Sequence, residues 1–294
     1  MSGNAVKAAR VPSRRRGGVA AAVDGAEQYR WESDSAGMAP EDLAALQRAV
    51  ESLEHPGLAA RLANLAGKPI ELLGHALPAS ALDAIAKATS RGLELALEVA
   101  LRTMQWTPAP QFLHKAFAAA SGAAGGAFGL VTLPIELPVS TVIMLRSIAD
   151  IARSEGEDLS DPETALSCVQ VFALGGRDAS DASDSGYFAV RGMLAKSVTE
   201  AARFIAERGA VKEGGPLLVR FIMQVASRFG VVVTQKVAAQ AVPVVGALGG
   251  AAVNYAFIEH FQEVARGHFT VRRLERVYGK NLVRTEYERL ARER

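Results

Sequence analysis

The feature that most constrains this chain is the run from Ala116 to Leu145, in which Glu136 is the only ionisable side chain. Lys115 and Arg146 border the run on either side. A soluble protein rarely leaves so long a stretch without charge unless the stretch is buried on every side, and about 20 apolar residues are enough to span a bilayer. The run therefore predicts either the centre of a helical core or a segment that contacts lipid. It indicates no reaction.

Composition favours helices and excludes several classes of protein. Apolar residues make up 49% of the 294 residues but aromatics only 6%, so the core is built from Ala, Leu and Val, which favours packed helices over a β sandwich. The 33 Lys and Arg nearly balance the 31 Asp and Glu, unlike the strongly basic footprint of a nucleic-acid binder. The single Cys168 excludes an internal disulfide and indicates a reducing compartment.

The domain organisation is indicated by where helical periodicity begins. Residues 1–37 mix Arg, Gly, Ser and Ala without periodicity, which is typical of a disordered basic tail. The apolar piece after Arg14–Arg16 is too short for a signal peptide, so no export is expected. From Pro40 onwards, apolar residues recur at helical spacing between Gly and Pro breaks. We predict an all-α multi-helix bundle in a single domain, residues 38–294.

Two glycine-rich apolar windows are expected at the centre of this bundle. The second window runs from Val237 to Ile258 and contains no charged side chain, whereas the first contains Glu136 alone. Small residues spaced four apart let helices approach backbone to backbone, so the glycines are predicted to pack against helices or to face a membrane. These glycines are Gly122, Gly125, Gly126 and Gly129 in the first window and Gly246, Gly249 and Gly250 in the second.

The prolines of the first window predict an interruption. Pro134 and Pro138 each remove an amide donor and clash with the preceding turn. We therefore expect a helix, a break around these prolines, and a second helix from about Val139 to Ser154.

Glu136 is the residue whose position most requires an explanation. An ionised carboxylate among apolar groups is costly unless it is paired. We interpret it as a structural ion pair, with Arg146, Arg153, Arg220 or Arg228 as partner, or as a helix N-cap, in preference to a catalytic acid. Glu259, at the end of the second window, is interpreted in the same way. The candidate buried polar residues are thus Glu136, Arg146, Asp150, Arg153 and Glu259.

Other patterns do not meet the requirements of known sites. His260 and His268 are eight residues apart, whereas the helical zinc-protease pattern needs two histidines four apart with a Glu between them. The Asp178, Asp181 and Asp184 series lacks the alternate spacing of a calcium loop. No phosphate-binding loop and no Gly-x-Ser-x-Gly motif occurs. We predict no catalytic, cofactor-binding or metal residues.

The chain ends in a segment expected to form a basic amphipathic helix from about Thr270. It carries eight Lys or Arg against four Asp or Glu. Such a helix can lie on anionic headgroups.

Several motifs occurring in order resemble the EcsC-like proteins. They are SGAAGGAFGLVTLPIELP, MLRSIADIARSEGEDL and VPVVGALGGAAVNYAFIEHFQEVARGHF, and the likeness extends from about Leu82 to Tyr278. The resemblance implies a bacterial, helical, membrane-associated protein, in a family named for a member encoded beside an ABC transporter. It lends no active site, and although some relatives carry a peptidase label, no residues here support one.

Three functions are compatible with these observations. The preferred one is a non-enzymatic cytoplasmic protein that associates with the inner membrane and supports a transporter or other envelope machinery, without nucleic acid as a partner. The second is a hydrolase for a peptide or lipid-like substrate, with Glu136 or Glu259 as acid or base. The third is a soluble helical scaffold that never contacts lipid.

Overall fold

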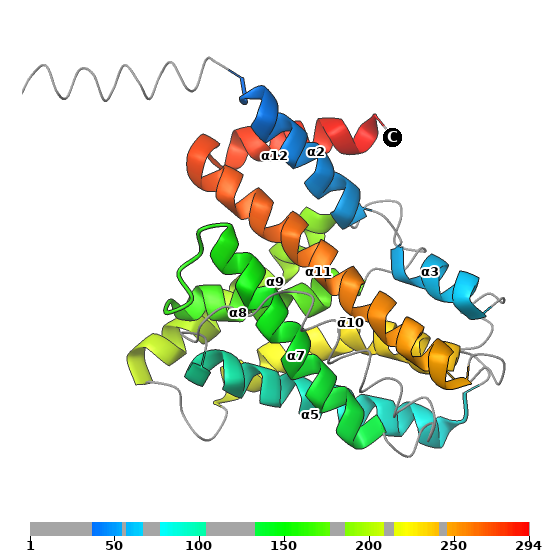
Figure 1. The fold of residues 1–294 in the computed structure, drawn as a ribbon. Coiled ribbons are helices and arrows are strands. Elements are labelled where there is room, and N and C mark those ends of the chain that lie inside the picture. The colour runs from blue at the N-terminus through cyan, green and yellow to red at the C-terminus, as the bar shows by residue number, and fades with distance from the viewer. Residues whose placement is uncertain are drawn as a thin grey trace, which may run out of the picture. The chain divides into compact units, whose positions relative to one another are not determined.

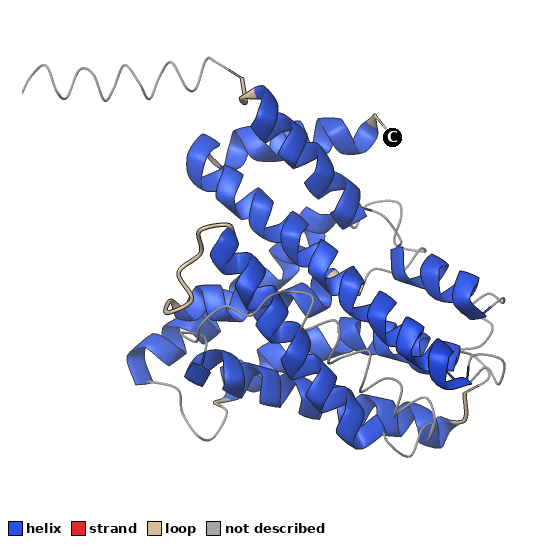
Figure 2. Ribbon diagram, viewed as in Figure 1, coloured by secondary structure: helices blue, strands red, loops and turns tan. Residues whose placement is uncertain are grey.

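The computed structural model describes residues 37–54, 57–66, 77–103, 133–176, 186–208, 215–240 and 246–293. The chain divides into two compact units, Met1–Pro40 and Glu41–Arg294, and the second contains the helical bundle. Every regular element in the described ranges is a helix, which confirms the predicted all-α class (Figure 2). The predicted tail, residues 1–37, lies outside the described residues except for Gly37. The helices, labelled in Figure 1, are α2 (Pro40–Glu54), α3 (Gly57–Ala66), α5 (Ala79–Thr103), α7 (Leu133–Ser154), α8 (Pro162–Leu174), α9 (Tyr187–Arg208), α10 (Pro216–Gln240), α11 (Gly246–Tyr278) and α12 (Lys280–Arg292).

Several helices begin where the sequence predicts. The carboxylate of Asp161 caps α8 by accepting from the Thr164 amide at 3.2 Å, and Pro162 occupies the first turn, where its missing amide hydrogen costs nothing. The first turn of α2 carries Glu41 and Asp42, whose negative charge suits the amide end of the helix. The start of α2 at Pro40 is therefore as predicted, and the start of α8 has a capping signal that is visible in the sequence.

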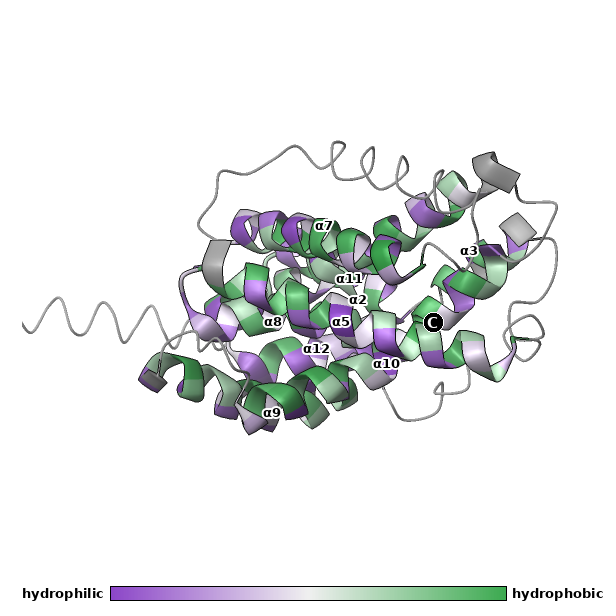
Figure 3. Cartoon of the chain, turned by 90° about the horizontal axis from the view of Figure 1, so that it is seen from below, coloured by the Kyte–Doolittle hydropathy of each residue, from purple (hydrophilic) through white to green (hydrophobic). Residues whose placement is uncertain are grey.

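The core forms where α8, α10 and α11 meet. Four phenylalanines from these helices, Phe172, Phe229, Phe257 and Phe261, are fully buried. Their ring centroids lie 4.8–6.1 Å apart in tilted or edge-to-face pairs, the favourable geometry for aromatic rings. A second group of ring contacts, formed by Tyr187, Phe188 and Tyr287, lies between α9 and α12. Figure 3 shows green and purple residues along each helix, as expected for amphipathic helices that bury one side.

The predicted break in the first window is wrong. Helix α7 begins at Leu133 and continues through Pro138 to Ser154, so its start is six residues earlier than the sequence predicts. Pro138 removes one hydrogen bond, but the surrounding helix is buried, including Leu137 and Met144. On α5, Gly92 lets the two helices approach, because a Cβ there would lie only 3.0 Å from the Thr141 Oγ1 of α7. Burial of this face outweighs the missing bond.

The predicted start of the C-terminal helix is also wrong. Thr270 lies inside α11, and the interruption comes at Gly279, whose φ of 82° suits glycine. Gly267 does not end the helix. A Cβ there would lie 2.7 Å from the Leu53 side chain, so this glycine serves the close approach of α2.

The two windows are described only in part. The glycines of the first window, Gly122, Gly125, Gly126 and Gly129, lie outside the described residues. Gly246 and Gly249 lie in the first turn of α11, and Gly250 is buried. Helices α7 and α11, which carry the described parts of both windows, pack against each other. A role of the glycines in packing or membrane contact stays a prediction.

Candidate functional site

Glu136 belongs to a buried ion pair. Glu136 is 8% exposed, and its Oε1 accepts a hydrogen bond of 2.9 Å from Lys236 Nζ. Lys236, on α10, is 1% exposed, and its ammonium lies 4.9 Å from the centre of the Phe257 ring. The expected arginine partner is therefore wrong, because the fold brings a lysine 100 residues away to this position. The pair joins α7 to α10 beside α11, where the two windows meet.

The other predicted polar residues do not converge on one site. Arg153 pairs with Asp150 one turn away on α7 at 2.9 Å. Glu259, on α11, contacts Arg61 of α3 at 3.5 Å, and Arg61 lies closer, at 2.9 Å, to Glu263. Arg146 is half-buried on α7. Sequence reasoning missed Arg61, because its helix is short and nothing local marks a basic residue as an inter-helix partner.

A charge network occupies the C-terminal half of α11. Arg272 binds Glu157 with two hydrogen bonds of 2.9 Å, and Arg276 contacts the same carboxylate. Arg273 bridges Glu155 at 2.9 Å and Asp42 at 3.0 Å. Burial acts to raise the pKa of Glu157, but the two guanidiniums hold it below its ordinary value. These arginines were expected to contact lipid headgroups, but they form ion pairs within the protein instead.

A second buried network joins α9 to α11. Arg191 makes two hydrogen bonds to Glu275, at 2.8 and 2.7 Å, and a third to the Tyr187 hydroxyl at 3.3 Å. The hydroxyl also shares a hydrogen bond of 2.8 Å with Nδ1 of His268. Burial lowers the pKa of His268 well below its ordinary value, so the ring is neutral. His260, the other histidine of the pattern, is buried as well and donates to the Gly175 carbonyl at 2.9 Å.

Helix α12 neutralises much of its own charge. Arg284 pairs with Glu288 at 2.8 Å, and Arg289 pairs with Glu286 at 2.9 Å and with Glu293. Arg292 lies 3.7 Å from Glu288. These pairs leave the net charge of the segment unchanged, but they place a carboxylate beside each of these arginines.

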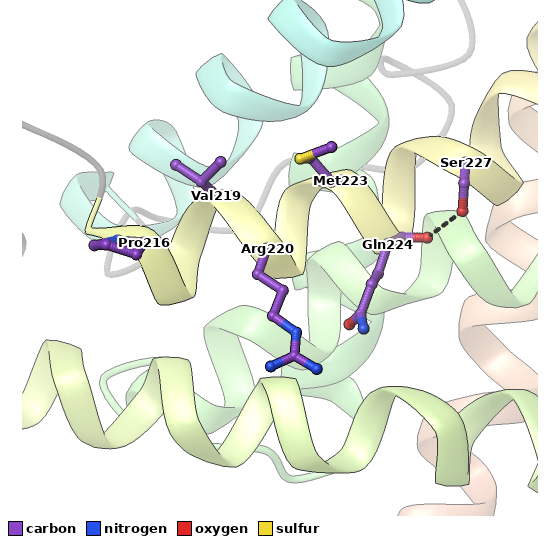
Figure 4. Close-up of a pocket in the computed structure, with 6 residues that line it drawn as sticks. All are labelled: Pro216, Val219, Arg220, Met223, Gln224 and Ser227. Carbon is purple, nitrogen blue, oxygen red and sulfur yellow. Dashed lines mark hydrogen bonds between the residues drawn. The ribbon is translucent and has the colours of Figure 1, made fainter.

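Another exposed feature of the described part of the chain is the outer side of α10. We call the α10 face the set Pro216, Val219, Arg220, Met223, Gln224 and Ser227, which line an open depression of about 600 Å³ (Figure 4). Val219 is 48% exposed and Met223 is 67% exposed. In Figure 4 these two point to one side of the helix, while Arg220 and Gln224 point towards α9. Neither Glu136 nor Glu259 lines this depression.

Helix α10 also stands out along its length. Of the helices in the described ranges, it is the one long and apolar enough to cross a membrane, although the core helix of a soluble protein meets the same criteria. Less than half of its most apolar stretch is buried. Its inner side packs Phe221, Val225 and Phe229 into the core, so the exposed remainder is the α10 face.

Comparison with models of protein families identifies the family to which the chain belongs. A model of the EcsC protein family matches residues 40–274, from the start of α2 through most of α11. The chain belongs to the EcsC family. This confirms the resemblance carried by the window motifs. The EcsC region contains α10, Glu136 and Lys236, and it ends before α12. No curated protein and no solved structure matches the chain.

Proposed function

We propose that this EcsC protein is a non-enzymatic helical protein that associates with the cytoplasmic side of the inner membrane through the α10 face and supports transporter or other envelope machinery there. The observation that carries the proposal is the exposure of Val219 and Met223 on an apolar helix. Large exposed apolar side chains gathered beside one another are typical of surfaces that bind a partner or a membrane.

The proposed contact is peripheral. To cross the bilayer, α10 would have to withdraw Phe221, Phe229 and Lys236 from the core, and Lys236 would lose its carboxylate partner. To lie at the interface, it needs only to place Val219 and Met223 among the headgroups and upper acyl chains. The second arrangement leaves the fold unchanged.

The described parts of the windows are less suited to lipid. In the second window, Val253, Asn254, Phe257 and Ile258 are all buried. In the first, the part from Leu133 onwards is buried except for Pro134, Ile135 and Val139 and a few half-buried positions. Most of their described apolar surface is used for packing between α7, α10 and α11, and the large apolar exceptions on α7 are Ile135 and Val139, which are 74% and 47% exposed.

The hydrolase alternative depends on a free carboxylate beside a pocket. Glu136 is held by Lys236, and Glu259 contacts Arg61 and the Tyr255 hydroxyl. A general acid or base must reach a substrate, and both carboxylates instead contact neighbouring side chains. The geometry therefore favours a binding protein.

The experiment is fractionation of the native protein, with a high-salt wash of the membrane pellet followed by alkaline carbonate. We expect the protein in the membrane pellet and its release by one of these washes. Recovery in the soluble fraction from the start would overturn the proposal in favour of the scaffold. Resistance to both washes would contradict the peripheral mode and indicate that the windows enter the bilayer.

A matched pair of variants tests the surface itself. Val219→Ser combined with Met223→Ser removes two partly exposed apolar side chains and should weaken membrane association about tenfold, from the area they would bury. The control is Val277→Ser on α11, where the wild-type residue is 60% exposed. Equal loss in both variants would show that the α10 face has no special role.

A further inference from the structure

We propose that the α10 face selects anionic phospholipids, with the guanidinium of Arg220 binding the lipid phosphate and with Val219 and Met223 contacting the acyl chains. This inference rests on the proposed membrane association and adds the chemistry of the lipid.

The arrangement of the α10 face matches the two parts of a phospholipid. Pro216, Val219 and Met223 follow one another at spacings of three and four residues, which places them along one side of the helix. Arg220, Gln224 and Ser227 follow one another at spacings of four and three residues and form a polar stripe beside the first. Figure 4 shows Val219 and Met223 on one side of the ribbon and Arg220 and Gln224 on the other, the α9 side.

The charge of Arg220 is available to a ligand. On α9 and α11, by contrast, Arg191, Arg272 and Arg273 each bind a carboxylate at 3.0 Å or less. Arg220 is exposed, and no carboxylate among the described residues lies within ion-pair distance of it.

The surroundings of Arg220 favour an anion. Helix α10 contains no Asp or Glu at all. The acidic residues of the neighbouring α9, Glu200 and Glu207, have cationic partners on their own helix, Lys196 at 3.8 Å and Arg203 at 2.8 Å. An uncompensated cation beside an apolar stripe complements the charge of an anionic headgroup above its acyl chains.

Gln224 provides a second donor next to the guanidinium. Its side-chain oxygen accepts from the Ser197 hydroxyl at 2.5 Å, which fixes the amide and leaves the NH₂ group for another acceptor. An arginine binds phosphate oxygens through two parallel N–H groups, so Arg220 and Gln224 together offer a set of donors suited to a phosphodiester.

The test uses the full-length protein and vesicles of two compositions, phosphatidylcholine alone and phosphatidylcholine with phosphatidylglycerol, in a flotation assay. We expect preferential binding to the vesicles that contain phosphatidylglycerol. Arg220→Gln should lower binding to those vesicles about fivefold, the effect of one basic residue near an anionic surface, and should leave binding to phosphatidylcholine unchanged. Arg284→Gln on α12 removes the same charge from an exposed, internally paired site and should have little effect.

The outcomes separate the two proposals. Wild-type protein that floats with neither vesicle overturns the membrane association itself. Equal binding to both vesicles, or the same loss in Arg220→Gln and Arg284→Gln, overturns the lipid selection while the membrane association stands. Circular dichroism of each variant confirms that the helices are intact, and Arg220→Lys, which keeps the charge without the paired N–H groups, should retain part of the preference.

Discussion

Replacing Lys236 by methionine should destabilise the protein by about 3–5 kcal/mol, because the substitution leaves the Glu136 carboxylate buried without a partner. The two side chains lie 2.9 Å apart, at 1% and 6% side-chain exposure, so water cannot take the place of the missing ammonium. The variant also loses the contact of the ammonium with the Phe257 ring, 4.9 Å away, which is worth about 0.5–2 kcal/mol in a desolvated site. Glu136→Leu should be destabilising for the converse reason, since it leaves the Lys236 ammonium buried without its carboxylate.

The double variant distinguishes a stranded charge from a lost contact. Combining Glu136→Leu with Lys236→Met replaces the pair by apolar groups of similar size, and such replacements are often neutral or stabilising by about 1–4 kcal/mol. The double variant should therefore recover most of the stability that either single change removes. Coupling of this size is expected only between groups in contact.

The assay is equilibrium urea unfolding followed by circular dichroism, with the four proteins of the cycle measured at one pH and ionic strength. The control is Lys87→Met, which breaks an exposed pair with Asp83 one turn away and should cost less than about 0.5 kcal/mol. If Lys236→Met is as mild as Lys87→Met, or if the double variant is no more stable than the single ones, the reasoning from burial is refuted.

Two further predictions concern backbone packing and titration. Gly176→Ala should destabilise the protein by about 1–3 kcal/mol, because the new Cβ would lie 2.5 Å from the Arg228 carbonyl oxygen, whereas Gly230→Ala, with open space around it, should be neutral or stabilising; equal urea midpoints would contradict this. Burial lowers the pKa of His260 and His268, so below about pH 6.5 the unfolded chain takes up protons that the native protein does not. The free energy of unfolding should therefore fall as the pH drops from 7 towards 5, by up to about 1.4 kcal/mol per pH unit for each histidine, and His268→Gln should reduce the slope; a flat profile would refute it.

The sequence predicts those parts of the fold that depend on local chemistry. The start of α8 at Pro162 is set by a capping aspartate and a proline, both of which act within one turn. The course of α7 through Pro138 is not set by local chemistry, because the hydrogen bond lost there is outweighed by packing against α5. Helix propensity accounts for the cost of Pro138 within α7, but it contains no information about the packing of α7 against α5.

The ionic contacts show the same limit. Glu136 could be recognised as a buried carboxylate that needs a cation, since the charge-free run around it is visible in the sequence. The sequence could not identify Lys236 as the partner in place of the four candidate arginines, because the partner is determined by which part of α10 packs beside Glu136 in the folded protein. Likewise Arg272 and Glu157 are 115 residues apart, and each resembles an ordinary charged surface residue when it is considered alone, Arg272 on a helix and Glu157 in the loop before α8.

The distribution of paired cations explains why membrane contact is expected at α10 and not at the basic C-terminus. A net charge of +2 over the whole chain provides little general attraction to an anionic surface. Ion pairs such as that of Arg272 with Glu157 cancel at distances shorter than the screening length of about 8–10 Å, so they contribute little to the field outside the protein. Among the described residues, no carboxylate pairs with Arg220, and it lies beside Val219 and Met223, so a single surface combines charge and apolar area. That surface falls within the region matched by the EcsC family, whereas α12 falls outside it.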